Sequence, residues 1–400
     1  MTPHVAVIGA GPVGVLSALL LARQGISVTL VDRNATLTTE SHASTFHPST
    51  LDLLATMGVD LAAHPDAVRV TSVQWRDNRG AVLAEVDYRL LEGITGHPFR
   101  LHLDQQSLLD RLAVLLASES RITVRFGLTA VGLDPSRPEV TVSSADGRHH
   151  TITADAVVGC DGAHSAVRSL SAIPFPVAAY PTGAIRAYAT MDLATAIPTN
   201  QPERPLSGLC YFRGRGDGVS ALRMRTDTRL IVRTRNQQDD KSRLREAVAN
   251  ATPWSIDDLD IVRIDSYRLQ RGVAQSYLCE RGPVLILGDA AHVTSTAGGL
   301  NMNSGIHDAF ALMPVVADWL HGRVGRSALE LLAASRRNYL LREVIPRGER
   351  RVQGLQDPDR DSLNGHLADL DQLSADSAAA RQFLIEASLL DTPLAAVRTS

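Results

Sequence analysis

The feature that most constrains the fold is a glycine-rich turn near the N-terminus, GAGPVG over residues 9–14. The β-rich residues 4–8 before it predict a strand, and the apolar pattern of 12–24 after it predicts a helix. A second strand over 26–31 ends at Asp32. This order is typical of a Rossmann-like unit, in which the turn faces a dinucleotide pyrophosphate and the acid faces a ribose. The motif alone does not separate NAD from FAD, and a plain turn between packed elements is the alternative.

The composition is that of an ordinary globular chain. Its 400 residues suffice for two or three domains, and the net charge of −3 gives no electrostatic case for binding nucleic acid or an anionic membrane. Cys160, Cys210 and Cys279 form no C-x-x-C pair, so we expect neither a metal site nor disulfides. Without a basic leader or a bilayer-length apolar run, the sequence predicts a cytoplasmic protein.

A second motif, CDGAHSAVR over residues 160–168, follows an apolar strand over 156–158. The Asp-Gly pair predicts a turn, and Ser165 and Arg168 lie one turn apart on one face of the helix that follows. Two interpretations stay open. The motif is either a binding loop or a helix cap built on Asp161.

A third motif, GDAAH over residues 288–292, follows a buried strand over 284–287 and continues as VTSTAGGLNMN. The small-residue turn leaves Asp289 able to bind a polyol hydroxyl. The glycines at 298 and 299 lead into a helix that starts near Asn303, whose N–H groups can stabilise negative charge on a ring. For His292 we favour a loop histidine hydrogen-bonded to the backbone over a catalytic role.

The remaining chain divides by its patterns. Residues 72–87 predict a β-hairpin, and 174–270 predict a mostly antiparallel region of arginine-bearing strands. The tail from residue 328 is predicted to be helical.

Together, the three motifs in this order and spacing resemble those of the single-component, class A FAD-dependent aromatic monooxygenases, a family built like para-hydroxybenzoate hydroxylase. The resemblance extends over residues 3–345. It implies an α/β fold in which a β-sheet substrate domain is inserted into a Rossmann-like FAD-binding domain, followed by a helical C-terminal tail. The expected segments are 1–70, 95–175 and 271–335 for FAD, 71–94 and 176–270 for substrate, and 336–400 for the C-terminal helices.

The resemblance also implies roles for individual residues. Positions in and around the three motifs would bind FAD: Gly9, Gly11, Val13, Gly14, Asp32, Arg33, His42, Gln105, Asp161, Asp289, Leu300, Asn301, Met302 and Asn303. Asp161, Gly162 and Arg168 form the DG motif, which the family associates with NAD(P)H as well as FAD. No metal is implied.

The implied reaction consumes NADPH or NADH and O₂. Hydride reduces the flavin, O₂ adds to give a C4a-hydroperoxide, and one oxygen enters a small aromatic or heteroaromatic substrate. The candidate catalytic residues are His47, Tyr211 and Arg213. Further candidates for lining the substrate site are Arg186, Tyr188, Arg223 and Arg225, whose arginines suit a carboxylate but individually more often face solvent. We expect a monomer or a homodimer.

Departures from the family pattern keep alternatives open. Ser295 and Thr296 replace two prolines, His42 replaces an arginine, and Asn301 replaces a glycine at a position where positive φ is then restricted. The alternatives are an FAD-dependent reductase or dehydrogenase that does not oxygenate, Baeyer–Villiger or epoxidase chemistry on the same fold, and a flavin-stabilised accessory protein. A flavin halogenase is disfavoured because Lys241 is the only lysine and no WxWxIP motif is present.

Overall fold

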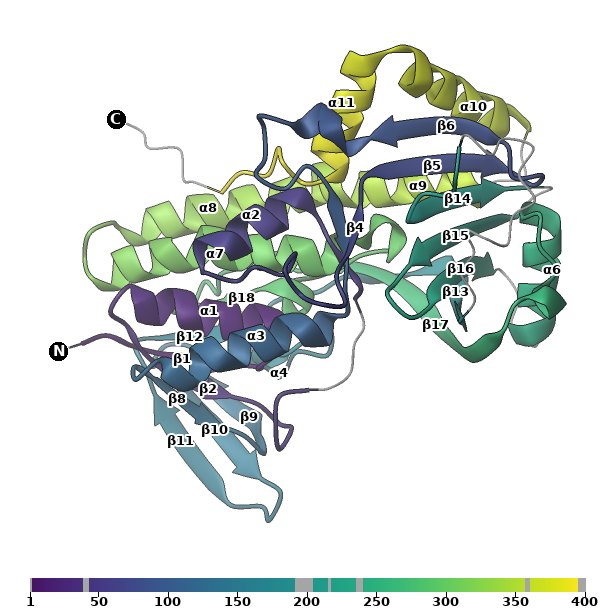
Figure 1. Cartoon of the computed structure of the whole chain (residues 1–400). Coiled ribbons are helices and arrows are strands. Elements are labelled where there is room, and N and C mark those ends of the chain that lie inside the picture. The colour runs from purple at the N-terminus through teal and green to yellow at the C-terminus, as the bar shows by residue number, and fades with distance from the viewer. Residues whose placement is uncertain are drawn as a thin grey trace.

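A five-stranded parallel sheet organises one half of the molecule (Figure 1). The computed structural model describes residues 2–38, 43–190, 204–214, 217–234, 240–356 and 360–394. The strands are mostly buried on both faces, as parallel sheets require. Their spatial order is β18 (Val284–Ile286), β12 (Ala156–Gly159), β1 (His4–Ile8), β2 (Ser27–Val31) and β8 (Ile122–Arg125).

Helices cover this sheet. α1 (Pro12–Arg23) packs against both α3 (Gln105–Ser118) and α7 (Leu300–Leu320), and α8 (Arg326–Tyr339) packs on α7. α7 begins at Leu300, earlier than the pattern around Asn303 predicted, because the positive φ angles of the preceding glycines complete the turn by residue 299. An antiparallel sheet of β9 (Leu128–Asp134), β10 (Glu139–Ser144) and β11 (His149–Thr153) shares the same hydrophobic core.

An eight-stranded sheet forms the other half, at the right in Figure 1. The predicted hairpin is confirmed as β5 (Ser72–Asp77) and β6 (Val82–Asp87), which pair antiparallel. β5 also pairs in parallel with β14 (Leu209–Arg213). The hairpin therefore joins a strand that lies more than a hundred residues later in the sequence. The remaining strands, in sheet order from the far edge, are β19 (His292–Val293), β17 (Ile261–Val273), β13 (Val177–Ala189), β16 (Thr228–Thr234), β15 (Gly218–Arg223) and β14 (Leu209–Arg213).

Two helical layers pack on this sheet. α6 (Asp240–Ala251) covers one face through a core that includes Phe212, Leu230 and Val232. α10 (Arg360–Ala375) and α11 (Ser377–Ala387) pack against the β5–β6 hairpin, at the top of Figure 1. α9 (Ile345–Gln356) contacts β14 and β15 and also the turn before α7, so it lies between the two sheets.

Short elements join the two halves. β7 pairs with β3 and with β4 in a small sheet, and β17 continues the large sheet to the edge strand β19. These and the remaining short elements are β3 (Thr45–Phe46), α2 (Pro48–Thr56), β4 (Val68–Val70), η1 (Tyr88–Leu91), β7 (Arg100–His102), α4 (Ala166–Leu170), η2 (Ile256–Asp258), η3 (Gly288–Ala290), η4 (Ala297–Gly299) and η5 (Leu340–Val344).

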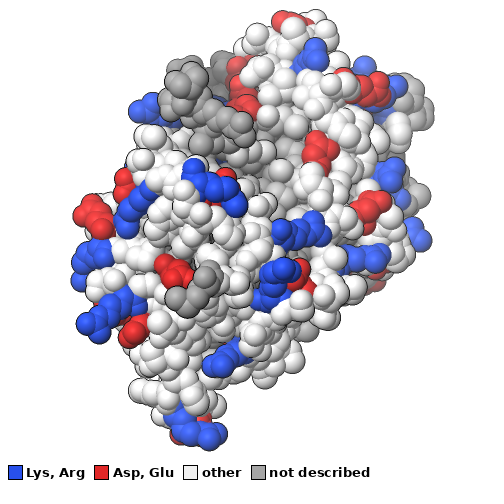
Figure 2. Space-filling model, turned by 90° about the vertical axis from the view of Figure 1, so that its left-hand side faces the viewer, with Lys and Arg blue, Asp and Glu red and all other residues white. Residues whose placement is uncertain are grey.

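The surface is electrostatically mixed on the face drawn in Figure 2, where basic and acidic side chains are interspersed. Within the described part of the chain, no helix is both long and apolar enough to cross a membrane.

Candidate functional site

The glycine-rich turn packs tightly against the second motif. Gly9 has φ +103°, and a side chain there would collide with the carbonyl of Cys160; one at Gly14 would collide with the carbonyl of Gly9. Gly11 differs, because a Cβ there would meet nothing within 4 Å. The N-terminus of α1, where Gly11 is the N-cap, receives no side-chain cap. The turn therefore presents backbone N–H groups beside open space, as a phosphate site requires.

Asp32 lies at the carboxyl end of β2, beside this turn. Its Oδ2 accepts a hydrogen bond of 2.6 Å from the Ala10 N–H, and its Oδ1 accepts one of 2.8 Å from the Asn34 N–H. The neighbouring Arg33 is exposed. The carboxylate is thus fixed in orientation but only partly buried, which leaves it able to accept from a ribose hydroxyl.

Asp161 caps the helix that follows it. Its carboxylate accepts hydrogen bonds from the Ser165 hydroxyl at 2.5 Å and from the Ala166 N–H at 2.7 Å. Arg168 donates to the Ala290 carbonyl at 2.8 Å, and its guanidinium lies 3.8 Å from the Phe175 ring centroid. The capping interpretation therefore describes Asp161 correctly, while Arg168 joins the DG motif to the GDAAH turn.

The three motifs meet at the carboxyl edge of the parallel sheet. A Cβ at Gly288 would lie 3.0 Å from Cγ2 of Val13, and one at Gly305 would lie 2.9 Å from the same atom. The turns after β1, β12 and β18, which are far apart in sequence, are therefore in contact. Crevices at the carboxyl ends of parallel strands are where such sheets bind ligands.

Asp289 is exposed in this turn, although Gly288 and Ala290 beside it are buried. Its Oδ1 accepts a hydrogen bond of 2.8 Å from the side-chain amide of Asn301. Asn301 has helical rather than positive φ; the positive values fall on Gly298 and Gly299. Replacing glycine by asparagine at 301 consequently imposes no left-handed backbone.

The expectation that the His292 ring bonds to the backbone is wrong. Its ring is fully buried and contacts side chains: Nε2 lies 2.7 Å from Asp308 Oδ2 and Nδ1 lies 3.3 Å from Asn301 Oδ1. The other oxygen of Asp308 accepts from Arg336 Nε at 2.9 Å. Burial raises the pKa of Asp308, but Arg336 and His292 outweigh it and the net pKa is lowered. Sequence reasoning missed this partner, Asp308, which lies on α7.

The N-terminus of α7 is held by Asn303. Its side-chain amide donates to the carbonyls of Thr45 and Gly299, at 3.0 and 2.7 Å, and its Oδ1 accepts from the His47 N–H at 3.1 Å. Leu300 is buried and Met302 is partly buried on the same turn. No side chain caps this helix, so its first N–H groups remain available to a ligand.

His47 is a buried histidine with two arginines nearby. It is the N-cap residue of α2 and fully buried, and its Nε2 lies 2.9 Å from the Gly298 carbonyl oxygen. Burial, with Arg100 and Arg351 nearby, holds its pKa well below the ordinary value. Because a carbonyl only accepts, Nε2 carries the proton, and Nδ1, which has no partner among the described residues, is the free acceptor.

Other predicted residues are placed as follows. Gln105 is buried and begins α3. Tyr211 and Arg213 are on β14, on the sheet face opposite to α6, and the Tyr211 ring centroid lies 5.8 Å from that of Trp75. Arg213 lies close enough to His366 of α10 to contribute, after burial, to lowering its pKa. His42 is outside the described residues.

Among the substrate-site candidates, Arg223 and Arg225 are exposed, the more frequent outcome for such arginines; β15 ends at 223, so strand alternation no longer governs 225. Arg186 is already paired with Asp265, at 3.2 Å, and Tyr188 donates to the same carboxylate at 3.1 Å.

Two other arginines in this region are buried, Arg100 and Arg233, and a third, Arg351, is partly buried with a buried Nη1. Arg233 belongs to the alternating strand that the sequence showed, whereas Arg351 comes from the tail and had no local signal.

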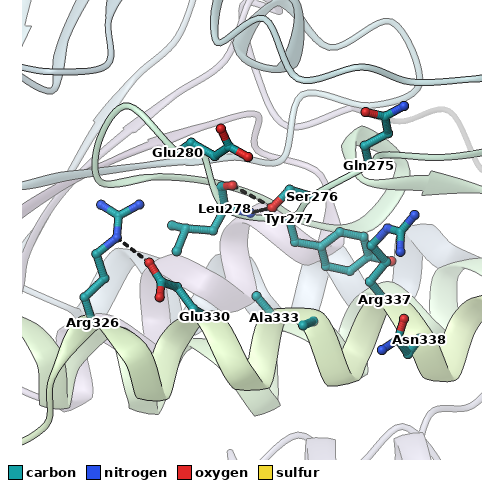
Figure 3. A pocket seen from close by; sticks show the side chains of 11 residues that line it. Gln275, Ser276, Tyr277, Leu278, Glu280, Arg326, Glu330, Ala333, Arg337 and Asn338 are labelled. Atoms are coloured by element: carbon teal, nitrogen blue, oxygen red, sulfur yellow. Dashed lines mark hydrogen bonds and ion pairs between the residues drawn. The ribbon is translucent and has the colours of Figure 1, made fainter.

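A separate cavity of about 220 Å³ lies between residues 275–280 and α8 (Figure 3). Its guanidinium groups have partners: Arg326 pairs with Glu330, and Arg337 donates to the Ala274 carbonyl. Tyr277 lines it and stacks on His292, with ring centroids 6.1 Å apart. The volume is below the range typical of cofactor pockets.

The residues at the carboxyl edge fit FAD. α1 and α7 both present uncapped N-termini, Gly11 borders open space, and the carboxylates of Asp32 and Asp289 follow two strands of the same sheet. In the described chain, no group of three or more His, Cys, Asp or Glu side chains could hold a metal ion.

Comparisons with known proteins agree with this site. Residues 2–343 match the family model described as FAD binding domain. The chain is 25% identical over 362 residues to 6-hydroxy-3-succinoylpyridine 3-monooxygenase of Pseudomonas putida, covering 89% of each protein. It is 23% identical over 403 residues to para-nitrophenol 4-monooxygenase of a Pseudomonas species, covering 97% of this chain and 96% of that one.

Solved structures share the fold. The crystal structure of p-nitrophenol 4-monooxygenase from Pseudomonas putida superposes with a TM-score of 0.86 at 21% identity and 98% coverage of both chains. A flavin-dependent monooxygenase solved with FAD and substrate gives a TM-score of 0.73 at 21% identity, covering 97% of this chain and 72% of that one. The expected α/β architecture is thereby confirmed. The chain belongs to the FAD binding domain family and is an FAD-dependent monooxygenase of the class A flavin hydroxylases.

Proposed function

We propose that this monooxygenase uses NADPH or NADH and O₂ to hydroxylate a small aromatic or heteroaromatic ring that binds between the Gly298 turn and the eight-stranded sheet. The observation that carries the proposal is the meeting of the three motif turns at one sheet edge, where α1 and α7 both leave their N-termini uncapped. The named relatives act on a pyridine and on a nitrophenol, which supports a substrate of this size.

The geometry supports a cofactor-binding role for each part of the site. The N-terminus of α1, beside Gly11, suits the pyrophosphate, and Asp32 suits the adenosine ribose. Asp289 suits the ribityl hydroxyls, and the first N–H groups of α7 suit the electron-rich edge of the isoalloxazine. When bound, FAD supplies hydride acceptance and oxygen activation.

The DG segment has a positioning role in this proposal. Asp161 is occupied in capping α4, so it orients the backbone at Gly162 rather than offering a free carboxylate. Arg168, held between the Ala163 and Ala290 carbonyls, fixes this segment against the GDAAH turn. We infer that NAD(P)H docks beside this segment without a second Rossmann-like unit. The division into FAD and substrate domains at residues 70, 94, 175 and 270 is likewise our proposal.

His47 is the best placed hydrogen-bond acceptor on the substrate side. Its lowered pKa keeps the ring neutral near pH 7, so its free Nδ1 can accept a hydrogen bond from a phenolic hydroxyl, although it is too weakly basic to take the proton. Polarising the phenolic O–H bond raises the electron density of the ring, which favours oxygen insertion. Tyr211 and Arg213 lie on the sheet side of the same region.

The deciding experiment uses the purified protein loaded with FAD. We expect a flavin absorption spectrum, and NAD(P)H oxidation that an aromatic substrate stimulates and that incorporates one atom of ¹⁸O₂ into the product. Oxidation without label in the product would favour a reductase, whereas bound FAD that no nicotinamide reduces would favour an accessory protein. Label in a lactone or epoxide would redirect the proposal to those reactions on the same fold.

A further inference from the structure

Three guanidinium groups are buried at the boundary between the two sheets. Arg100 on β7 is 4% exposed and Arg233 on β16 is 8% exposed. Arg351 on α9 has a buried Nη1. Each has a buried nitrogen with no hydrogen-bond partner among the described residues: Nε of Arg100, Nη1 of Arg233 and Nη1 of Arg351. We refer to these three residues as the arginine cluster.

The cluster surrounds one region. Arg100 donates to the Gly298 carbonyl at 3.0 Å, and a side chain at Gly298 would collide with Nη1 of Arg351. Tyr211 interacts electrostatically with both Arg351 and Arg233, so it lies near both. The cluster therefore extends from the turn before α7 to the inner face of the large sheet.

No carboxylate of the described residues is paired with any member of the cluster. Other buried arginines of this fold are satisfied: Arg336 pairs with Asp308 at 2.9 Å and Arg347 with Asp391 at 2.5 Å, while Arg76 donates to a side-chain amide and backbone carbonyls. Burial lowers the pKa of both Arg233 and Arg351, because the charged form is desolvated without an acidic partner. An unpaired buried charge is strongly unfavourable, so a ligand anion at this place would gain unusually strong, charge-assisted hydrogen bonds.

We propose that the arginine cluster binds an anionic group, a carboxylate or a phenolate, of the aromatic substrate. This inference rests on the proposed function and narrows its substrate class. The pyrophosphate is not the anion, because its site is the N-terminus of α1 at a different turn. Arg100 and Arg351 adjoin the Gly298 turn and Arg233 lies on the sheet, so the cluster spans the place where the substrate binds in our proposal.

The test compares matched ligands on the FAD-loaded enzyme by calorimetry. The pairs are para-hydroxybenzoate with para-hydroxybenzamide, 3-(3-hydroxyphenyl)propionate with its amide, and para-nitrophenolate with nitrobenzene. In at least one pair, we expect the wild type to bind the anion at least tenfold more tightly. Arg233→Gln and Arg351→Gln should abolish that difference. Arg350→Gln, an exposed neighbour on α9, is the matched control and should keep it.

Two results would overturn the proposal. One is that in every pair the wild type binds the neutral member as tightly as the anion, or binds neither. The other is that the variants keep the preference but shift the FAD midpoint potential, which would assign the cluster to the reduced cofactor instead. FAD content and NAD(P)H oxidation are measured in every sample. A wild type that binds FAD and oxidises NAD(P)H but shows no preference would overturn this inference alone, whereas a wild type that binds no FAD would overturn the proposed function.

Discussion

His292 Nε2 lies 2.7 Å from Asp308 Oδ2, and neither side chain is more than 2% exposed. The pair continues in both directions, to Arg336 on α8 and, through Asn301, to the exposed carboxylate of Asp289. A chain of polar contacts therefore connects the proposed ribityl-binding residue to the helical layer behind it. Because the links from Arg336 to His292 are buried and the link to Asn301 is partly buried, the network fixes the position of Asp289.

Removing the charge of Asp308 should be severely destabilising. Asp308→Asn leaves the Arg336 guanidinium buried without a counter-charge, a change that typically costs about 3–5 kcal/mol. The measurement is chemical unfolding at saturating FAD. Asp318→Asn, on the same helix but in an exposed pair with Arg323, is the control and should cost no more than about 1 kcal/mol. Similar losses for the two variants would show that the buried network is not structurally important.

The buried histidines should make the protein sensitive to mild acid. Burial, with Arg100 nearby, lowers the pKa of His102 to about 3; burial, with Arg336 nearby, lowers that of His307 to about 3. The pKa of His47 is lowered well below its ordinary value of 6.5, mainly by burial. The unfolded state therefore binds more protons below pH 6.5, so the free energy of unfolding falls as pH falls from there toward the folded pKa values. Each histidine adds a slope of about 1.4 kcal/mol per pH unit.

The check is urea unfolding between pH 7 and 4.5. His47, His102 and His307 together contribute a limiting slope of roughly 4 kcal/mol per pH unit, and His102→Gln should remove about one third of that contribution. His149→Gln, at an exposed position on β11, is the control. A His102→Gln profile parallel to that of the wild type would mean that His102 is protonated in the folded state.

The local parts of the site were predictable and the long-range parts were not. The glycine turn, Asp32 and the GDAAH turn carry short-range signals, because each conformation is set by residues next to it in sequence. Arg351 has no such signal. It reaches the Gly298 turn only because α9 packs between the two sheets.

The same reason explains the wrong expectation for His292. Its ring partner, Asp308, lies on a helix whose register against β19 is a tertiary property, so no local pattern indicates it. Arg223 and Arg225 face solvent, as individual strand arginines more often do.

Thr296→Pro tests the loop in which two family prolines are missing. Thr296 has φ −71°, a value that proline adopts, so the variant should fold. If the absence of the proline rings makes this loop more flexible, the Thr296→Pro variant should convert a larger fraction of the NAD(P)H consumed into hydroxylated product. It should also release less peroxide. Both quantities are measured in one assay. Ser295→Ala, which removes only the acceptor for the Ala297 N–H, is the comparison. An unchanged product-to-peroxide ratio would rule out a role for this loop in coupling.

Asp289→Ala should lose FAD without unfolding. The carboxylate is exposed, so its removal leaves no buried cavity, but the proposed acceptor for the ribityl hydroxyls is gone. Charge-assisted hydrogen bonds contribute about 1.5–3 kcal/mol, so the dissociation constant should rise roughly 10- to 100-fold. FAD titration and circular dichroism measure the two properties. Asn301→Gly removes the amide that orients Asp289, together with its contacts to His292 and Thr294, but keeps the carboxylate, so its effect on FAD affinity should be smaller. An Asp289→Ala variant with wild-type FAD affinity would remove this residue from the site.

Alanine substitutions at two glycines of the same turn should have different effects. Gly11 has φ −72° and open space around its Cα, so Gly11→Ala is compatible with the fold; the unfolding free energy should change by less than about 1 kcal/mol. The added methyl group nevertheless occupies the space where the pyrophosphate would approach, and FAD affinity should fall at least tenfold. Gly14→Ala places a methyl group against the Gly9 carbonyl, which must move, so we expect a loss of stability of about 1–3 kcal/mol as well as of FAD.

The unfolding free energy of each variant is measured without FAD, so that cofactor binding does not contribute to it. FAD titration then compares the FAD affinities of the variants and the wild type. Gly25→Ala is a less suitable control because Gly25 has φ +80°, whereas Gly325, with extended φ at the N-cap of α8, matches Gly11 in conformation and lies outside the site. Gly325→Ala should therefore keep wild-type FAD affinity. If Gly11→Ala also keeps it, the cofactor does not approach this turn, and the helix N-terminus at α1 is a structural feature only.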